Sequence, residues 1–266
     1  MNELSLAQAL APANWPTLVI VSGRVVGLML AAPLWSLAGV PRSARSAMAV
    51  VFTLVVLPSA TATQLPSDHL GLVFPLASEL ALGLAIGLVG AVFMAGVGMA
   101  GEVAALQMGL NLGPALSPMA EGTVTGVGEL KNLLALTLYV TLGGHLMLLS
   151  GVAGSFQVIP PGGMLAWDAG LRLVVDLGAA IFVTAVQVAA PVMVALLLAN
   201  LALAILSKAV PQLNAMAVAF PITIGLGLLV LGASLPHTGS FIGGWVGTLP
   251  SSVARTVNTL TPAGVR

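Results

Sequence analysis

The sequence predicts an all-α, polytopic membrane protein of about six long, partly kinked helices and helical hairpins. Of its 266 residues, 58% are hydrophobic and 6% are charged, and the mean hydropathy is +1.09. A soluble domain carries about 25% charged residues, so this chain could not cover a globular surface with charge. Several apolar runs reach the roughly 20 residues that an α-helix needs to cross a bilayer. They are too continuous for a membrane β-barrel, whose strands alternate over about ten residues.

The same composition excludes several classes of function. Nucleic-acid binding needs clustered basic residues, whereas eight Lys and Arg here balance eight Asp and Glu. The chain has no cysteine, which rules out disulfides and zinc–thiolate sites. His69, His145 and His237 are too far apart in the sequence for a metal motif. We therefore expect no cofactor, no metal, no nucleic-acid partner and no enzymatic activity.

The predicted spans differ in length. In chain order they cover residues 17–40, 46–58, 70–100, 131–152, 171–207 and 213–235, and a weaker run over 241–253 is expected to lie at the interface. The run over 171–207 would extend about 55 Å as one helix, well beyond a hydrocarbon core of roughly 30 Å. It should tilt, kink at Pro191 or leave the membrane. Such uneven lengths fit helices that pack mainly on other protein.

The connecting segments are short and rich in glycine and proline. Residues 66–71 (PSDHLG), 160–163 (PPGG) and 235–239 (LPHTG) are typical of turns, and the C-terminal part is predicted to form a long hairpin that turns at 207–214. Arg42 and Arg45 follow the first span, so the positive-inside rule places that loop in the cytoplasm and the N-terminus outside.

A glycine motif at 96–101 (GVGMAG) has two interpretations. It matches the G-x-G-x-x-G of dinucleotide sites, but a strand should precede that motif, and here an apolar run does. Small residues that let helices approach closely are the favoured explanation. The segments 83–87 (GLAIG) and 109–113 (GLNLG) have the same small-xxx-small spacing.

Polar side chains in the apolar runs are candidates for a transport path or for subunit contacts. An ionised group in lipid costs about 2.5–3.5 kcal/mol, so these groups should face protein or water. Snorkelling from helix ends is the alternative for Glu129, Lys131 and Lys208. Arg24 and Glu79, in contrast, lie well inside their runs. Arg24 is expected to pair with an acid that the sequence does not identify. The candidate contacts are Arg24, Glu79, Glu102, Gln107, Lys131, His145, Asp176, Lys208, Gln212 and Asn214.

The segment 107–128 (QMGLNLGPALSPMAEGTVTGVG) combines apolar residues with two prolines and five glycines. Proline and glycine interrupt helices. Irregular backbone at membrane depth is tolerated only inside protein or beside water. The segment is therefore either a gate or plug that lines a pore or an ordinary external loop, and composition does not separate the two.

Four blocks, in their order and spacing, resemble the flagellar biosynthetic protein FliR family, which includes the matching injectisome export component of the SctT or SpaR type. The resemblance spans about residues 24–235, and the GGH in its third block favours the flagellar branch. The blocks are 23–49 (GRVVGLMLAAPLWSLAGVPRSARSAMA), 79–89 with 101–113 (ELALGLAIGLV and GEVAALQMGLNLG), 130–149 with 156–162 (LKNLLALTLYVTLGGHLMLL and FQVIPPG), and 196–229 (LLLANLALAILSKAVPQLNAMAVAFPITIGLGLL).

This resemblance implies a subunit of the flagellar type III protein export gate, located in the bacterial inner membrane at the flagellar basal body. The implied partners are FliP-like and FliQ-like subunits, together with FlhB-like and FlhA-like components, exported flagellar proteins and the lipid bilayer. Within a single export-apparatus domain over 1–266, about residues 1–165 would be similar to FliP. About residues 166–250 would be similar to the FliQ hairpin.

The resemblance also implies a plug at about 110–126 that closes the pore before secretion starts. This stretch has no aromatic residue, so Leu110, Leu112, Leu116 and Met119 would have to seal it. The predicted plug residues are Leu110, Asn111, Leu112, Gly113, Pro114, Leu116, Pro118, Met119, Glu121, Gly122 and Gly126.

The alternatives are an injectisome export component and a small-solute transporter or ATP-driven importer permease. Residues 102–109 (EVAALQMG) partly match the E-A-A loop of such importers, although the acid is displaced by one position and the later L-P is missing. An intramembrane hydrolase would need a nucleophile paired with a base, and no such pair is recognisable.

Overall fold

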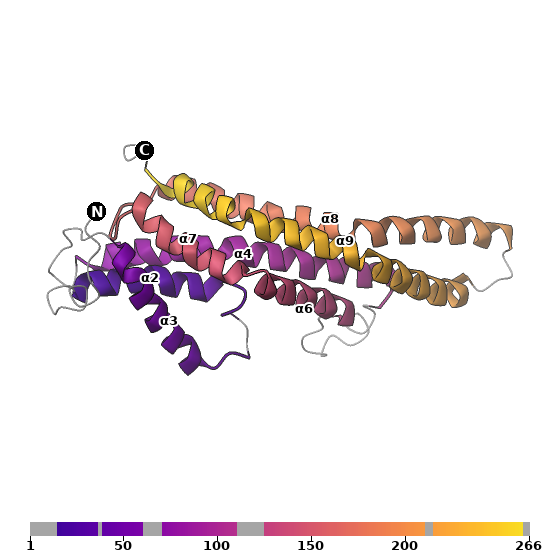
Figure 1. Ribbon diagram of the computed structural model, residues 1–266. Helices are drawn as coiled ribbons and strands as arrows, with labels where there is room; N and C mark the ends of the chain where they lie inside the picture. The colour runs from indigo at the N-terminus through magenta and orange to yellow at the C-terminus, as the bar shows by residue number, and fades with distance from the viewer. Residues whose placement is uncertain (1–14, 37–38, 61–70, 111–124, 211–214, 263–266) are drawn as a thin grey trace. The chain divides into compact units, whose positions relative to one another are not determined.

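The computed structural model describes residues 15–36, 39–60, 71–110, 125–210 and 215–262. Every element in these ranges is helical, which confirms the predicted fold class, and Figure 1 shows their order. The short 3-10 helix η2 (Leu57–Ser59) follows α3. The α-helices are α2 (Trp15–Ala31), α3 (Arg42–Val56), α4 (Val73–Met108), α6 (Gly126–Thr141), α7 (Gly144–Val158), α8 (Trp167–Ala209) and α9 (Ala215–Leu260).

Three of these helices, α4, α8 and α9, are long and apolar enough to cross a membrane. The number becomes four if α6 and α7 count as one bent span. The sequence predicts about six spans, and the described residues contain fewer helices of spanning length. The difference lies in α2 and α3, whose 17 and 15 residues fall short of the roughly 20 that a span needs.

Helix α9 continues through the predicted turn at 235–239 and through the run expected to be interfacial. Its buried residues recur every three or four positions, so packing against other helices holds the segment helical despite Pro236. This buried stripe comprises Leu231, Ser234, Thr238, Ile242, Val246, Leu249 and Val253.

Glycine divides the predicted span over 131–152 into α6 and α7. Gly143 adopts a φ of 74°, a left-handed conformation that ends α6, and α7 begins at Gly144. The predicted turn at 160–163 is confirmed, and Gly162 has a φ of 78° there. The predicted turn at 207–214 lies between the end of α8 and the start of α9, and its residues 211–214 are outside the described ranges.

The chain folds into two compact units, each assembled from separate segments. The first comprises residues 1–92, 139–178 and 245–266, and the second comprises 93–138 and 179–244. Helices α4, α8 and α9 therefore contribute to both units. The predicted boundary at about residue 165 separates a part expected to be similar to FliP from a part expected to be similar to FliQ. This boundary stays a prediction.

In the first unit, α2 and α4 cross at glycines. A Cβ atom at Gly83 would overlap the carbonyl oxygen of Arg24, and one at Gly27 would overlap that of Leu80. A Cβ at Gly87 would lie 2.8 Å from the Cβ of Ala31. The segment 83–87 thus packs two helices at backbone distance, as its small-xxx-small spacing predicts.

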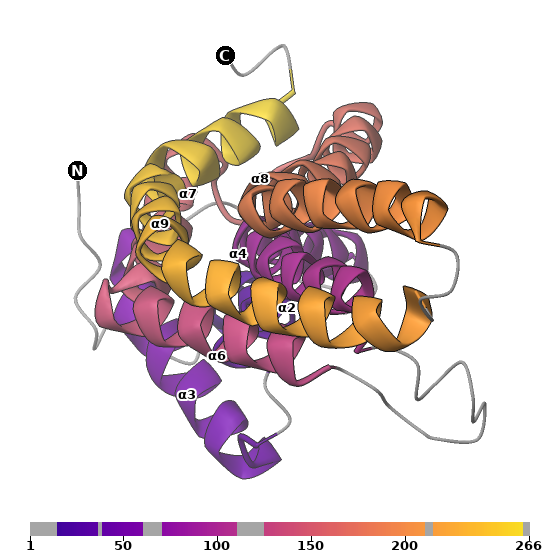
Figure 2. The same ribbon diagram turned by 90° about the vertical axis from the view of Figure 1, so that its right-hand side faces the viewer.

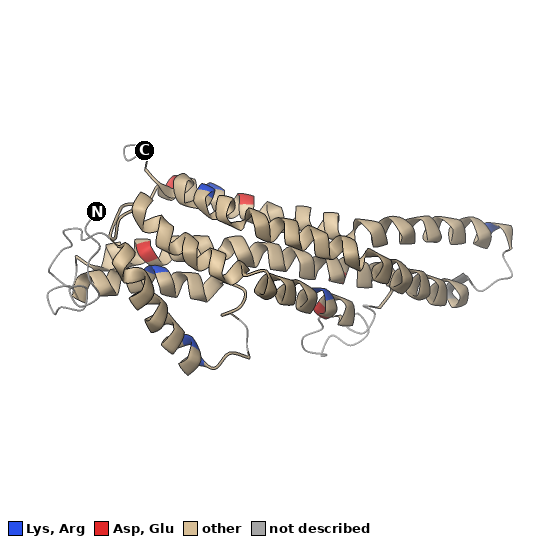
Figure 3. Ribbon diagram, viewed as in Figure 1, with Lys and Arg blue, Asp and Glu red and all other residues tan. Residues whose placement is uncertain are grey.

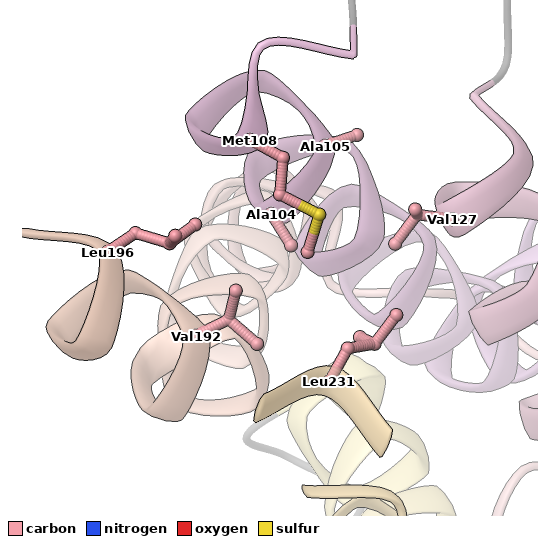
Figure 4. Close-up of a cluster of buried hydrophobic side chains, with 7 residues drawn as sticks. All are labelled: Ala104, Ala105, Met108, Val127, Val192, Leu196 and Leu231. Carbon is pink, nitrogen blue, oxygen red and sulfur yellow. The ribbon is translucent and has the colours of Figure 1, made fainter. Parts of the chain in front are cut away.

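The second unit has an apolar core to which four helices contribute. Figure 4 shows side chains of α4, α6, α8 and α9 converging there. The first part of α9 lies alongside α6, as Figures 1 and 2 both show, and Thr238 of α9 contacts Lys131 of α6. The core comprises Ala104, Ala105, Met108, Val127, Val192, Leu196 and Leu231.

Charged residues are sparse along the long helices, as Figure 3 shows. In α8 they cluster near the ends: Asp168 lies in the first turn and Lys208 in the last, where each complements the helix dipole. Arg172 and Asp176 also lie within the first ten residues of α8, and the stretch 177–207 carries no charged residue, as expected for a helix that crosses a bilayer.

Candidate functional site

A buried ion pair links α2 to α4. The side chains of Arg24 and Glu79 are 0% and 2% exposed. Arg24 Nε lies 2.5 Å from Glu79 Oε2, and Arg24 Nη2 donates to Glu79 Oε1 at 2.9 Å. This bidentate geometry is the strongest form of arginine–carboxylate contact. Among the predicted polar residues it identifies the acid with which Arg24 pairs.

The remaining donors of Arg24 bind the end of α7. Nη1 donates to Ser155 Oγ at 2.8 Å, and Nη2 donates to the carbonyl oxygen of Ile159 at 3.0 Å. The guanidinium carbon lies 3.8 Å from the ring centroid of Phe156, which adds a cation–π contact. One arginine therefore joins α2, α4 and α7.

Glu79 also fixes the turn that follows α7. Its Oε1 accepts a hydrogen bond from the backbone N–H of Gly162 at 2.9 Å. With this bond and the pairing to Arg24, the buried carboxylate is compensated, as a buried charge must be. No sequence pattern singles out Ser155, Ile159 or Gly162, although they lie in or next to the FQVIPPG block.

Lys131 is a second buried cation, with a different environment. It is 0% exposed on α6, and its Nζ lies 3.4 Å from Thr238 Oγ1 of α9. Unlike Arg24, which pairs with Glu79, Lys131 forms no ion pair with a carboxylate of the described residues. The explanation of Lys131 as a snorkelling residue is wrong, because its side chain is enclosed by the second unit.

Two sets of contacts hold the ends of the segment 111–124, which itself lies outside the described residues. At its start, α4 ends in a Schellman motif: Leu110 N–H donates to Ala105 O at 3.0 Å, and Gly109 has a φ of 78°. Phe220 of α9 packs over Gly109, where a Cβ would lie 2.9 Å from Cε1 of the ring. Thr223 Oγ1 donates to the carbonyl oxygen of Met108 at 3.4 Å.

At the other end of that segment, Glu102 of α4 binds the N-terminus of α6. Its Oε1 accepts the backbone N–H of Thr125 at 2.9 Å, while Thr125 Oγ1 accepts the N–H of Gly128 at 3.1 Å. Thr125 is thus an N-cap, and Glu102 supplies from a distant helix the acceptor that a capping-box glutamate would supply locally. A Cβ at Gly128 would overlap Glu102 Oε1, and Gly101 faces Gly128 at backbone distance.

The other predicted residues are not brought into these clusters. Asp176 and Lys208 are exposed on α8, and Gln107 is half-buried near the end of α4. The ring of His145 meets that of Tyr139 edge-on, with 6.5 Å between centroids. The predicted residues that lie outside the described ranges are Asn111, Leu112, Gly113, Pro114, Leu116, Pro118, Met119, Glu121, Gly122, Gln212 and Asn214; Leu110 and Gly126 flank the first nine of them.

Comparison with known proteins decides the family. The model of the family described as bacterial export proteins, family 1, matches residues 15–248. The chain belongs to this family. The match includes all four sequence blocks, both anchored ends of the segment 111–124, and the residues that bind Arg24.

Three similar proteins share one name. The flagellar biosynthetic protein FliR of Escherichia coli (strain K12) is 30% identical over 227 residues, which cover 85% of this chain and 85% of that protein. The FliR of Bacillus subtilis (strain 168) is 28% identical over 222 residues, covering 82% and 85%. The FliR of Caulobacter vibrioides is 29% identical over 218 residues, covering 81% and 87%. The resemblance to the FliR family is therefore confirmed.

Proposed function

We propose that this protein is the FliR-type subunit of a flagellar type III export gate, the channel through which flagellar proteins leave the cell. It is a multi-pass protein of the bacterial inner membrane. The observation that carries the proposal is the family match over 15–248, together with FliR relatives that align over most of both chains. The apolar helices α4, α8 and α9 support the membrane location. The role is that of a channel wall, with no catalytic step.

Deletion and complementation test this assignment. Loss of the gene should abolish secretion of flagellar proteins and swimming, and a plasmid copy should restore both. Uptake of small solutes should stay unchanged. If swimming and flagellar protein secretion persist in the deletion strain while uptake of a solute fails, the importer alternative replaces the proposal.

The proposed partners are FliP-like and FliQ-like subunits, with FlhB-like and FlhA-like components beside them. Large exposed apolar side chains on α8 and α9 support such contacts, among them Leu197, Leu201 and Leu229 at 64%, 59% and 73% exposure. Likeness of about 1–165 to FliP and of about 166–250 to FliQ is part of the same proposal. It would allow this chain to occupy one position in a ring of similar subunits.

We further propose that the segment at about 110–126 is a plug of the export channel. Support comes from its helix-breaking sequence and from the anchors at both ends: the Schellman motif under Phe220, and the cap formed by Glu102 and Thr125. Anchored ends would hold a plug in register while its middle is displaced by an exported chain.

Glu102 provides a sharp test of the plug. Glu102→Ala removes the acceptor of the Thr125 N–H and should raise ion leakage through the assembled gate in cells that are not secreting. Glu102→Gln keeps an amide oxygen as acceptor and should leak far less, so the pair is matched. Shortening residues 111–124 should leave assembly intact and give the largest leak. Unchanged conductance in the shortened and the Glu102→Ala gates, with normal assembly, would remove the plug role.

A further inference from the structure

An open groove lies between α2 and α3 in the first unit. Figure 1 shows α3 angled away from α2, and the space between them has a volume of about 690 Å³. The walls are largely apolar. Leu18, Val26, Met29 and Leu30 line it from α2, and Ala49, Val50 and Leu54 line it from α3. Leu30 and Val50 are 54% and 60% exposed, so the groove is accessible from outside this chain.

The end of the groove at the start of α3 is cationic. Arg42 and Arg45, both in the first turns of this helix, belong to the lining, and the described lining residues include no Asp or Glu. Arg42 is exposed, and Arg45 donates from Nη2 to the carbonyl oxygen of Val40 at 3.2 Å, so its guanidinium is held near the helix start. The N-terminus of α3 adds the partial positive charge of the helix dipole.

Charge and apolar surface are separated along the length of α3. Arg42 and Leu54 are twelve residues apart, which places them about 18 Å apart along the helix axis. A ligand that fits this pattern has an anionic head and a long apolar tail. We propose that the groove binds an anionic phospholipid, with its phosphate at Arg42 and Arg45 and an acyl chain along Val26, Val50 and Leu54.

One further observation favours a lipid over a helix of a neighbouring subunit. The arginines follow the apolar helix α2 at the start of α3, and basic pockets beside apolar membrane helices bind anionic head groups.

Native mass spectrometry of the full chain, purified in mild detergent with its co-expressed export-gate subunits, tests the site. The probes are phosphatidylglycerol and phosphatidylcholine with the same acyl chains. We expect phosphatidylglycerol to be retained at least ten times more than phosphatidylcholine, and the preference to be lost in the double variant Arg42→Gln, Arg45→Gln. The double variant Arg172→Gln, Arg255→Gln is the control, because it removes the same two charges from exposed positions on α8 and α9, outside the groove.

A second variant separates the tail from the head. Ala49→Leu fills the groove without changing charge and should lower retention of both lipids. The proposal is overturned if phosphatidylglycerol retention is equal in the wild type and the double arginine variant while all complexes assemble. It is likewise overturned if a photo-crosslinker at Val50 labels a partner subunit instead of lipid.

Discussion

Arg24 shows how one buried charge organises the first unit. Its guanidinium binds Glu79 of α4, Ser155 of α7 and the carbonyl oxygen after α7, and no polar group of the pair is left without compensation. Burying two charges is costly, and a pair of this kind contributes specificity of packing more than net stability. The arginine thus fixes which surfaces of α2, α4 and α7 meet.

The sequence predicted that Arg24 pairs with an acid, but several acids were available. Glu79 lies in the predicted span over 70–100 and Glu102 directly after it, and the choice depends on where α2 crosses α4. That crossing is set by glycines whose partners are 50 or more residues away, such as Gly83 against the carbonyl of Arg24. A residue pattern within one helix does not show which residues of another helix, 50 or more positions away in the sequence, it will contact.

Glu79→Gln should destabilise the protein strongly. It leaves the cation of Arg24 buried without a counter-charge, which typically costs about 3–5 kcal/mol. Thermal unfolding of the purified complex in detergent should show a lowered Tm, and Arg24→Lys should not preserve stability, because an ammonium cannot form the bidentate contact.

Two controls accompany this prediction. Asp176→Asn removes an exposed acid on α8 and should leave Tm unchanged. The double variant Arg24→Gln, Glu79→Gln has no uncompensated charge and should be more stable than Glu79→Gln alone. Equal Tm for the wild type and Glu79→Gln would show that the pair does not hold the unit together.

Lys131→Met should be neutral or stabilising. The ammonium is fully buried, with one long contact to Thr238 Oγ1, and replacing a poorly compensated buried charge by an apolar side chain of similar size often raises stability. Tm and flagellar protein secretion are the two readouts. A well-folded Lys131→Met protein that fails to secrete would show instead that this charge takes part in export.

At the scale of helices, glycine positions explain both a success and a failure of prediction. The small-xxx-small spacing at 83–87 predicted a close helix approach, and α2 packs there. The Gly143–Gly144 pair ends α6 and starts α7, yet the apolar run around it reads as one continuous span. A hydropathy profile measures the length of an apolar run, and it does not detect a residue whose left-handed backbone conformation ends a helix.

Helix α9 shows the opposite error. Leu235–Pro236 followed by Thr238–Gly239 is typical of a turn, but the helix continues through it. Residues on both sides of Pro236 belong to one buried stripe, including Ser234 and Thr238 at 5% and 1% exposure. Tertiary packing therefore outweighs the local preference, and this information lies in other segments of the chain.

Two alanine substitutions in α4 test the role of the crossing. Gly83→Ala places a Cβ onto the carbonyl oxygen of Arg24 and should cost about 1–3 kcal/mol or more through overpacking. Gly98→Ala meets no atom within 4 Å and should be neutral or stabilise α4 by up to about 1 kcal/mol. Thermal unfolding of both variants gives the comparison. Similar Tm values for the two would contradict the close packing at Gly83.

On the scale of the whole molecule, the distribution of burial matches a subunit more than a self-sufficient protein. In the most apolar 18-residue stretch of α4, 67% of residues are buried within the chain, against 22% in α8 and 22% in α9. Helix α4 is therefore a central element, whereas α8 and α9 present apolar side chains to lipid or to other subunits. The sequence predicted the all-α class, the membrane character and the family, because composition and motif order carry them. It did not predict how the segments combine into two units.

Site-specific photo-crosslinking on α8, in cells that assemble flagella, tests the central claim most directly. Leu197 is 64% exposed and its neighbour Leu196 is 0% exposed, so the two positions form a matched pair. We predict that a crosslinker at Leu197 captures another export-gate subunit and that one at Leu196 does not. Capture of lipid alone at Leu197, in a chain that is stable and monomeric without partners, would contradict this account.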